Sequence, residues 1–231
     1  MKKYILWDFD CTLAYRDGKW TQTLFELLQK HKQNIPYEVV KSMMQRKLPW
    51  HEFEKSHQQL FKGKQWWEYV DQYIEDSLKQ LGVKQAGNIA KEFKGHYLDL
   101  QYWHLYPNTI ETLEKLSALG YTHVIASNHV PELNELCEQL GISQYFETIF
   151  NSAFMEYEKP NIKFYQEILR KLEVPSTKIM IGDNYNADIR GALRANIPAI
   201  LLKEDNILNY RYYARSIEQV VEVIKNIEKN L

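Results

Sequence analysis

Two aspartates, Asp8 and Asp10, stand one residue apart directly after the apolar run Tyr4–Trp7 near the N-terminus. An apolar run without a polar break is typical of a strand buried on both faces in the centre of a parallel sheet. If the chain stays extended, both carboxylates point the same way, and they repel each other unless a cation or a shared proton offsets their charges. Ligands of open α/β sheets bind at the carboxyl ends of strands, so the pair is a candidate site. The alternative is that the two residues only end a strand and start a turn.

Further polar residues follow three later predicted strands. They are Ser127 and Asn128 after residues 121–126, Lys159 after residues 148–150, and Asp183 after residues 178–181, with Asp188 about one helical turn further on. In a parallel sheet all these carboxyl ends face the same edge, so we expect the side chains to gather there.

The chemistry of this set is coherent. Asp8 and Asp183 are hard oxygen donors of the kind that Mg²⁺ prefers. Ser127 and Lys159 offer a neutral donor and a fixed positive charge, which suit phosphate oxygens. One aspartate could attack phosphorus while the other handles the proton of the leaving group. Taken singly, each residue has a plainer explanation as a turn residue, a solvated lysine or a helix cap.

A long helical segment separates the first strand from the others. Helical stripes are predicted around residues 24–31, 39–44, 53–61, 66–81 and 85–97, with no convincing strand among them. From Leu105 onward, strands alternate with helices, which predicts a parallel sheet with right-handed crossovers. We therefore expect an α/β core formed by residues 1–15 and 101–231, with residues 16–100 inserted as a helical cap.

The motifs resemble those of the haloacid dehalogenase-like (HAD) hydrolase superfamily, in the type that carries a helical cap after strand 1. The likeness covers essentially the whole chain. Asp8–Thr12 is similar to the first motif, Ser127-Asn128 to the second, Lys159-Pro160 to the third, and Gly182-Asp183 to Asp188 to the fourth. The resemblance implies a Rossmann-like parallel-sheet core and a phosphatase that works through an aspartyl-phosphate.

The resemblance also implies a role for each motif residue. Asp8 would be the nucleophile, and Asp10 the general acid and then the base for the hydrolytic water. Mg²⁺ would be held by the Asp8 carboxylate, the Asp10 main-chain carbonyl and Asp183, while Asp188 would support the metal shell or hold Lys159. The residues implied to grip substrate are Cys11, Thr12, Ser127, Asn128 and Lys159.

Two of the motifs depart from their usual form, the first at one position and the fourth at two. Cys11 stands where a small residue, often glycine, is usual, and its backbone N–H is expected to reach the phosphate. Its thiol adds a possible oxidation liability near the nucleophile. In the fourth motif, Asn184 and Ala187 replace the more usual serine and asparagine. Neither departure removes a charge.

Several functions fit this pattern to different degrees. A Mg²⁺-dependent phosphatase of a small phosphorylated metabolite fits best, and a phosphomutase with the same aspartyl-phosphate chemistry is the alternative. A dehalogenase would usually lack an acid at Asp10, and a binding protein would usually have lost a charged motif residue. The sequence does not identify the substrate. The cap residues that could determine substrate specificity are Trp20, Arg46, Lys47, Trp50 and His51.

The net charge and the cysteine content limit the classes of partner and the compartment that fit this chain. A net charge of −1 over 231 residues creates no field that would recruit nucleic acid or an anionic membrane. The two cysteines, Cys11 and Cys137, do not form a disulfide framework, which fits a reducing compartment. We therefore expect a soluble cytoplasmic protein, a monomer or weak dimer, whose partner is a small-molecule phosphate ester.

Overall fold

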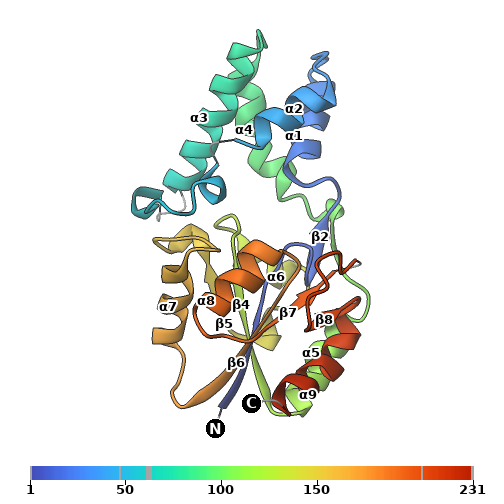
Figure 1. Ribbon diagram of the computed structural model, residues 1–231. Helices are drawn as coiled ribbons and strands as arrows, with labels where there is room; N and C mark the ends of the chain where they lie inside the picture. The colour runs from blue at the N-terminus through green and yellow to red at the C-terminus, as the bar shows by residue number, and fades with distance from the viewer. Residues whose placement is uncertain (1, 47, 61–63, 204, 230–231) are drawn as a thin grey trace.

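The computed structural model describes residues 2–46, 48–60, 64–203 and 205–229, and Figure 1 shows their arrangement. Within these residues, a sheet flanked by helices forms the core. Four α-helices form a separate group beyond the carboxyl ends of the strands. Among the helices that the structure describes, none is long and apolar enough to cross a lipid bilayer.

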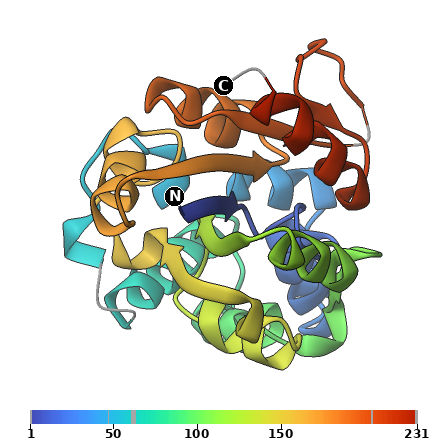
Figure 2. The same ribbon diagram turned by 90° about the horizontal axis from the view of Figure 1, so that it is seen from below.

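The main sheet has six strands, all parallel to their neighbours, in the order β5-β4-β1-β6-β7-β8. These strands are β1 (Lys2–Trp7), β4 (Tyr121–Ser127), β5 (Phe146–Asn151), β6 (Ser176–Gly182), β7 (Ala199–Leu202) and β8 (Tyr213–Ala214). β1 lies between β4 and β6, as Figure 2 shows from below. The parallel sheet predicted from the sequence is confirmed, while the short β8 was not predicted.

Helices cover both faces of this sheet because alternate side chains of β1 point to opposite faces. Ile5 and Trp7 belong to a core shared with α5 (Thr109–Ala118), α6 (Leu133–Gln139) and α9 (Val220–Glu228). Tyr4 and Leu6 belong to a second core shared with α7 (Ile162–Lys171) and α8 (Gly191–Arg194). The core is therefore Rossmann-like.

The predicted helical cap, residues 16–100, contains α1 (Lys19–Lys30), α2 (Tyr37–Met44), α3 (Lys64–Gln80) and α4 (Ala86–Tyr97). In Figure 1 these helices stand above the edge toward which the carboxyl ends of the strands point. The antiparallel strands β2 (Ala14–Arg16) and β3 (Trp103–Leu105) connect the cap to the core. The insertion of a helical cap after the first strand is confirmed.

The prediction of a helix around residues 53–61 is wrong. The chain forms one 3₁₀ turn just before this range, Pro49–His51, and one within it, Gln58–Leu60, while Phe61 lies outside the described residues. The intervening backbone makes contacts with the core in place of helical hydrogen bonds, because the N–H of His57 donates to the carbonyl of Glu156 at 2.8 Å. Tertiary contacts thus override the apolar spacing.

Candidate active site

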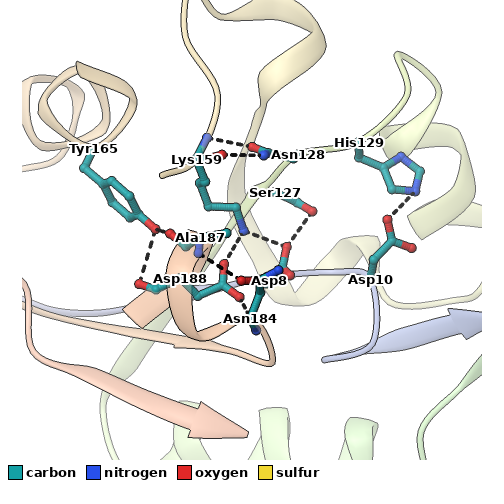
Figure 3. A network of polar contacts seen from close by, with 10 residues as sticks. All are labelled: Asp8, Asp10, Ser127, Asn128, His129, Lys159, Tyr165, Asn184, Ala187 and Asp188. Atoms are coloured by element: carbon teal, nitrogen blue, oxygen red, sulfur yellow. Dashed lines mark hydrogen bonds and ion pairs between the residues drawn. The ribbon is translucent and has the colours of Figure 1, made fainter. Parts of the chain in front are cut away.

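Three strands of the sheet bring polar side chains together at Asp8. The Asp8 carboxylate follows β1 and is largely buried. Its Oδ1 accepts a hydrogen bond from Ser127 Oγ at the end of β4 (2.7 Å) and another from Lys159 Nζ beyond β5 (2.8 Å), as Figure 3 shows. The gathering predicted from the strand ends is therefore present in the structure.

Lys159 is buried between two carboxylates. Its Nζ donates to Asp8 Oδ1 at 2.8 Å and to Asp188 Oδ1 at 2.6 Å. Burial alone would lower the pKa of Lys159, but the charges of Asp188 and Asp8 together outweigh that effect and raise it. The ammonium group therefore stays charged at neutral pH and supplies a fixed positive charge.

Asp188 is fully buried and lies on a π-helical segment, Tyr185–Arg190. Its Oδ2 accepts from the backbone N–H of Asn184 at 2.9 Å. A Cβ at Gly182 would lie 2.3 Å from the same Oδ2, so a residue with a side chain at that position would displace this carboxylate. Burial raises the pKa of Asp188, with Asp8 adding to the rise and Lys159 opposing it.

Asn128 contacts the backbone of Lys159. Its Nδ2 donates to the Lys159 carbonyl and its Oδ1 accepts from the Lys159 N–H, both at 2.9 Å. These two bonds position the Asn128 side chain against Lys159 and leave one N–H of its Nδ2 unused, and Asn128 also lines the cavity that holds Asp8, so the predicted contact with phosphate stays a prediction.

Three carboxylates converge beside this lysine. Oxygens of Asp8, Asp183 and Asp188 all lie within 4.8 Å of one another. Burial and the nearby Asp8 and Asp188 raise the pKa of Asp183 to about 8. One lysine does not balance three carboxylates, so a divalent cation with oxygen ligands fits this cluster. Asp8 and Asp183 are the better ligands, because both oxygens of Asp188 already accept hydrogen bonds from Lys159 and Asn184.

Asp10 lies apart from this cluster on the side of His129. Its Oδ2 is 3.8 Å from His129 Nε2, and both residues line the same cavity as Asp8. Burial raises the pKa of Asp10, His129 opposes the rise, and Asp8 adds to it. Asp8 and Asp10 are therefore in different environments, as separate chemical roles would require.

The structure changes what was expected of Cys11 and Thr12. The Cys11 N–H donates to the carbonyl of Ala14 at 2.8 Å, so in this conformation it does not point at a phosphate site. Cys11 has φ +60°, because the chain turns back there toward β2. Neither residue is among those that line the cavity, and the hydroxyl of Thr12 is buried without a hydrogen-bond partner among the described residues.

The cavity has a volume of about 630 Å³ and lies between the cap and the carboxyl edge of the sheet. Trp20 and Trp50, two of the predicted specificity residues, line it. Arg46 lines a different groove between α2 and α3, His51 is exposed beside Trp50, and Lys47 lies outside the described residues.

Other residues of the cavity were not predicted. They are Lys19, Phe53, Glu54, Tyr97, His129, Val130, Pro160, Asn184, Asn186, Ala187, Arg190 and Arg194. Four of these residues belong to the cap, so their approach to Asp8 depends on how the cap sits on the core, and five follow β6 within the core itself. His129 is different, because its position directly after Ser127-Asn128 at a strand end was a usable signal.

Comparisons with known proteins agree with this architecture. A family model described as "Haloacid dehalogenase-like hydrolase" matches residues 5–202. The glyceraldehyde 3-phosphate phosphatase of Methanothermobacter thermautotrophicus is 35% identical over 102 residues, which cover 43% of this chain and 45% of that protein. The protein of the same name from Methanopyrus kandleri is 26% identical over 207 residues, which cover 88% and 84%.

The match to the first of these relatives thus spans about half of its length. Among solved structures, the putative HAD-hydrolase YfnB from Bacillus subtilis, bound to magnesium, superimposes with a TM-score of 0.76. That structure is 16% identical, and the match covers 97% of this chain and 99% of that one, so the likeness is one of fold.

Proposed function

Because this chain belongs to the haloacid dehalogenase-like hydrolase family, we propose that it is a Mg²⁺-dependent phosphohydrolase that forms an aspartyl-phosphate on Asp8. The observation that carries the proposal is the environment of Asp8. One oxygen of its carboxylate accepts from both Ser127 and Lys159, at 2.7 and 2.8 Å. A phosphoryl group arriving at Asp8 would meet these same two donors, which suit its oxygens. The relatives named as phosphatases support the same chemistry.

The reaction would proceed in two steps on the residues of this chain. In the first, a carboxylate oxygen of Asp8 attacks phosphorus, the bond from phosphorus to the leaving oxygen breaks, and Asp10 gives that oxygen a proton. In the second, water attacks phosphorus, Asp10 takes a proton from it, and the bond to Asp8 breaks to release phosphate. Lys159 keeps its positive charge beside the phosphoryl oxygens throughout, because Asp188 holds it at 2.6 Å.

Mg²⁺ would be held by the carboxylates of Asp8 and Asp183 and by the main-chain carbonyl of Asp10. When bound, the ion supplies positive charge that reduces the repulsion between the Asp8 carboxylate and an anionic phosphate ester. The convergence of carboxylate oxygens within 4.8 Å fits such an ion.

The substrate would be a small phosphorylated metabolite. The cavity of about 630 Å³ has the size of a small-molecule site, and aromatic side chains such as Trp20 and Trp50 line its cap side. We also propose a reducing compartment, the cytoplasm, as the location of this protein, and the presence of only two cysteines in the chain supports this. A phosphomutase would use the same aspartyl-phosphate but would return the phosphoryl group to its product.

The test is hydrolysis of 4-nitrophenyl phosphate by the purified protein, with and without Mg²⁺. We expect release of inorganic phosphate that requires Mg²⁺ and stops in excess chelator. The variant Asp8→Asn should be inactive with unchanged circular dichroism, since an amide cannot attack phosphorus, while the matched variant Asp76→Asn, at an exposed position on α3, should keep full activity. Turnover by Asp8→Asn above trace levels, or an unchanged rate in chelator, would overturn the proposal. With a sugar phosphate in place of the aryl ester, isomerised substrate without free phosphate would favour the mutase.

A further inference from the structure

Arg190 and Arg194 lie one helical turn apart at the edge of the proposed active site. Arg190 ends the π-helical segment that carries Asp188, and Arg194 ends α8 directly after it. Helical residues four positions apart lie on the same face, with their Cα atoms about 6 Å apart. Both arginines are exposed and line the same cavity as Asp8, so a ligand in that cavity can reach both guanidinium groups.

The helical segment between Asp188 and Arg194 is fixed against the rest of the core. The hydroxyl of Tyr165 on α7 donates to the carbonyl of Ala187 at 2.6 Å, as Figure 3 shows. A Cβ at Gly191 would lie 2.6 Å from the Tyr165 ring, so the backbone of α8 packs closely against α7. The position of the two arginines relative to Asp188 is therefore set within the core and does not depend on the cap.

Neither arginine has an acidic partner among the described residues. Arg190 Nη1 donates to Asn186 Oδ1 at 3.0 Å, while Arg194 makes no side-chain hydrogen bond, ion pair or aromatic contact within the described part of the chain. No carboxylate stands three or four positions from either arginine in the sequence, and like charges at this spacing destabilise a helix. By contrast, Lys79 of α3 pairs with Glu75, one turn earlier, at 2.7 Å.

The carboxylates that line the cavity do not balance these two charges. Asp8, Asp10 and Asp183 belong with Lys159 to the proposed phosphoryl site. Glu54 of the cap also lines the cavity, but no ion pair joins any of these carboxylates to either arginine in the structure as described. The two guanidinium groups thus offer unused hydrogen-bond donors and positive charge beside the phosphoryl site, where an anion would satisfy both.

We propose that Arg190 and Arg194 bind a second anionic group of the substrate, on the leaving-group side of the phosphate ester. This inference rests on the function proposed above and narrows the substrate to esters whose leaving group carries a carboxylate or another phosphate. Two guanidinium groups on one helix face can donate hydrogen bonds to the oxygens of a single such group. The core helix α8 would then determine substrate specificity together with the aromatic residues of the cap.

The experiment compares substrates that differ in this second group. Release of inorganic phosphate in the presence of Mg²⁺ gives kcat/KM for 3-phosphoglycerate and for glycerol 3-phosphate, which has a hydroxymethyl group in place of the carboxylate. Fructose 1,6-bisphosphate and fructose 6-phosphate test a second phosphate in the same way. We expect the wild type to prefer the more anionic member of at least one pair by about 10 to 100 times, as charged hydrogen bonds allow. The pair that shows the preference identifies the anionic group as carboxylate or phosphate.

The double variant Arg190→Gln/Arg194→Gln tests whether the two arginines cause the preference. Its kcat/KM should fall much more for the preferred ester than for its less anionic counterpart, mainly through a higher KM. The control Arg170→Gln, at an exposed arginine of α7 outside the cavity, should keep the wild-type preference. Melting temperatures report whether each variant folds.

Two kinds of failure can be told apart. A wild type that hydrolyses 4-nitrophenyl phosphate but shows no preference within either pair would refute the anion-binding role of the arginines, and so would a double variant that keeps the preference. A wild type that releases no phosphate from any of these esters, 4-nitrophenyl phosphate included, would instead overturn the proposed function, and this inference with it.

Discussion

At the scale of single residues, the negative charge around Lys159 exceeds what one ammonium group can balance. Asp8 and Asp188 both contact its Nζ, and Asp183 has a carboxylate oxygen within 4.8 Å of theirs. Burial and the charges of Asp8 and Asp188 already raise the pKa of Asp183 to about 8, so its charged form is disfavoured in the folded protein. A bound cation would reverse that preference.

The variant Asp183→Asn tests this balance through stability. Without added metal we expect it to melt a few degrees above the wild type, because it removes a disfavoured charge; ~1 kcal/mol corresponds to about 2–4 °C at this chain length. Mg²⁺ should raise the melting temperature of the wild type much more than that of the variant. Thermal scans with and without Mg²⁺ measure both effects. An equal Mg²⁺ response in the two proteins would contradict Asp183 as a ligand.

His123 provides a pH-dependent contribution to stability. Trp7 Nε1 donates to its Nδ1, and its Nε2 lies 3.0 Å from the Leu113 carbonyl, so the ring is neutral with the hydrogen on Nε2. Burial lowers its pKa to about 4 from 6.5. Between these values the unfolded chain binds more protons than the folded one, so this contribution is fully present above pH 6.5 and is lost as the pH falls toward 4.

We expect this loss to reach about 3 kcal/mol at most, from 1.36 kcal/mol per pH unit. Urea denaturation of the wild type between pH 8 and 4 should show it. His123→Gln does not titrate, so its stability should fall less steeply over the same range. The control His104→Gln, at an exposed ring, should follow the wild type. A variant curve parallel to that of the wild type would count against His123.

At the scale of elements, Glu132 links the cap to the core. It precedes α6, and its carboxylate accepts from Trp67 Nε1 of α3 at 2.8 and 3.0 Å. Lys94 of α4 pairs with the same carboxylate at 2.5 Å. Because Val130 and His129 of the cavity lie just before Glu132, these contacts hold the cap over the site.

Glu132→Ala should therefore loosen the cap without touching the reacting groups. We expect KM for a phosphate ester to rise about three- to tenfold, since charge-assisted hydrogen bonds that are partly exposed are worth ~1 kcal/mol. The emission of Trp67 should also change. Steady-state kinetics and fluorescence spectra measure the two effects, with Glu135→Ala, exposed on the same helix, as the control. An unchanged KM would mean that the contacts of Glu132 do not hold the cap over the site.

At the scale of the whole molecule, the chain passes between core and cap twice, and Arg16 joins the two passages. Arg16 is buried on β2, donates from Nε to the carbonyl of Tyr97 (3.1 Å) and from Nη2 to that of His96 (3.0 Å), and stacks on Tyr102. It thus connects the start of the cap to the end of α4.

Arg16→Met should uncouple the unfolding of cap and core. Lost hydrogen bonds to buried carbonyls cost about 1–3 kcal/mol, so the melting temperature should fall by several degrees. Trp20, Trp50, Trp66 and Trp67 all lie in the cap, so tryptophan emission reports mainly on that part. In the variant we expect the emission to change at a lower temperature than the far-ultraviolet circular dichroism. Coincident transitions, as in the exposed control Arg215→Met, would contradict this coupling.

The sequence alone was sufficient to predict the features of the fold and the site that depend on local residue pattern. The buried run before Asp8 and the strand–helix alternation after Leu105 predicted the parallel sheet, and that sheet brings Asp8, Ser127, Lys159 and Asp183 to one edge. This worked because side-chain periodicity is set within a few residues, and the carboxyl ends of parallel strands share an edge whatever the loops between them.

Only the tertiary structure decided which atoms meet. The Asn128 amide binds the backbone of Lys159, the Cys11 N–H turns to Ala14, and Nε2 of His129 faces Asp10. These pairings depend on turn conformation and on segments far apart in the chain, and the cavity depends on where the cap rests on the core. A local sequence pattern does not predict such contacts, because their geometry exists only once both segments have packed.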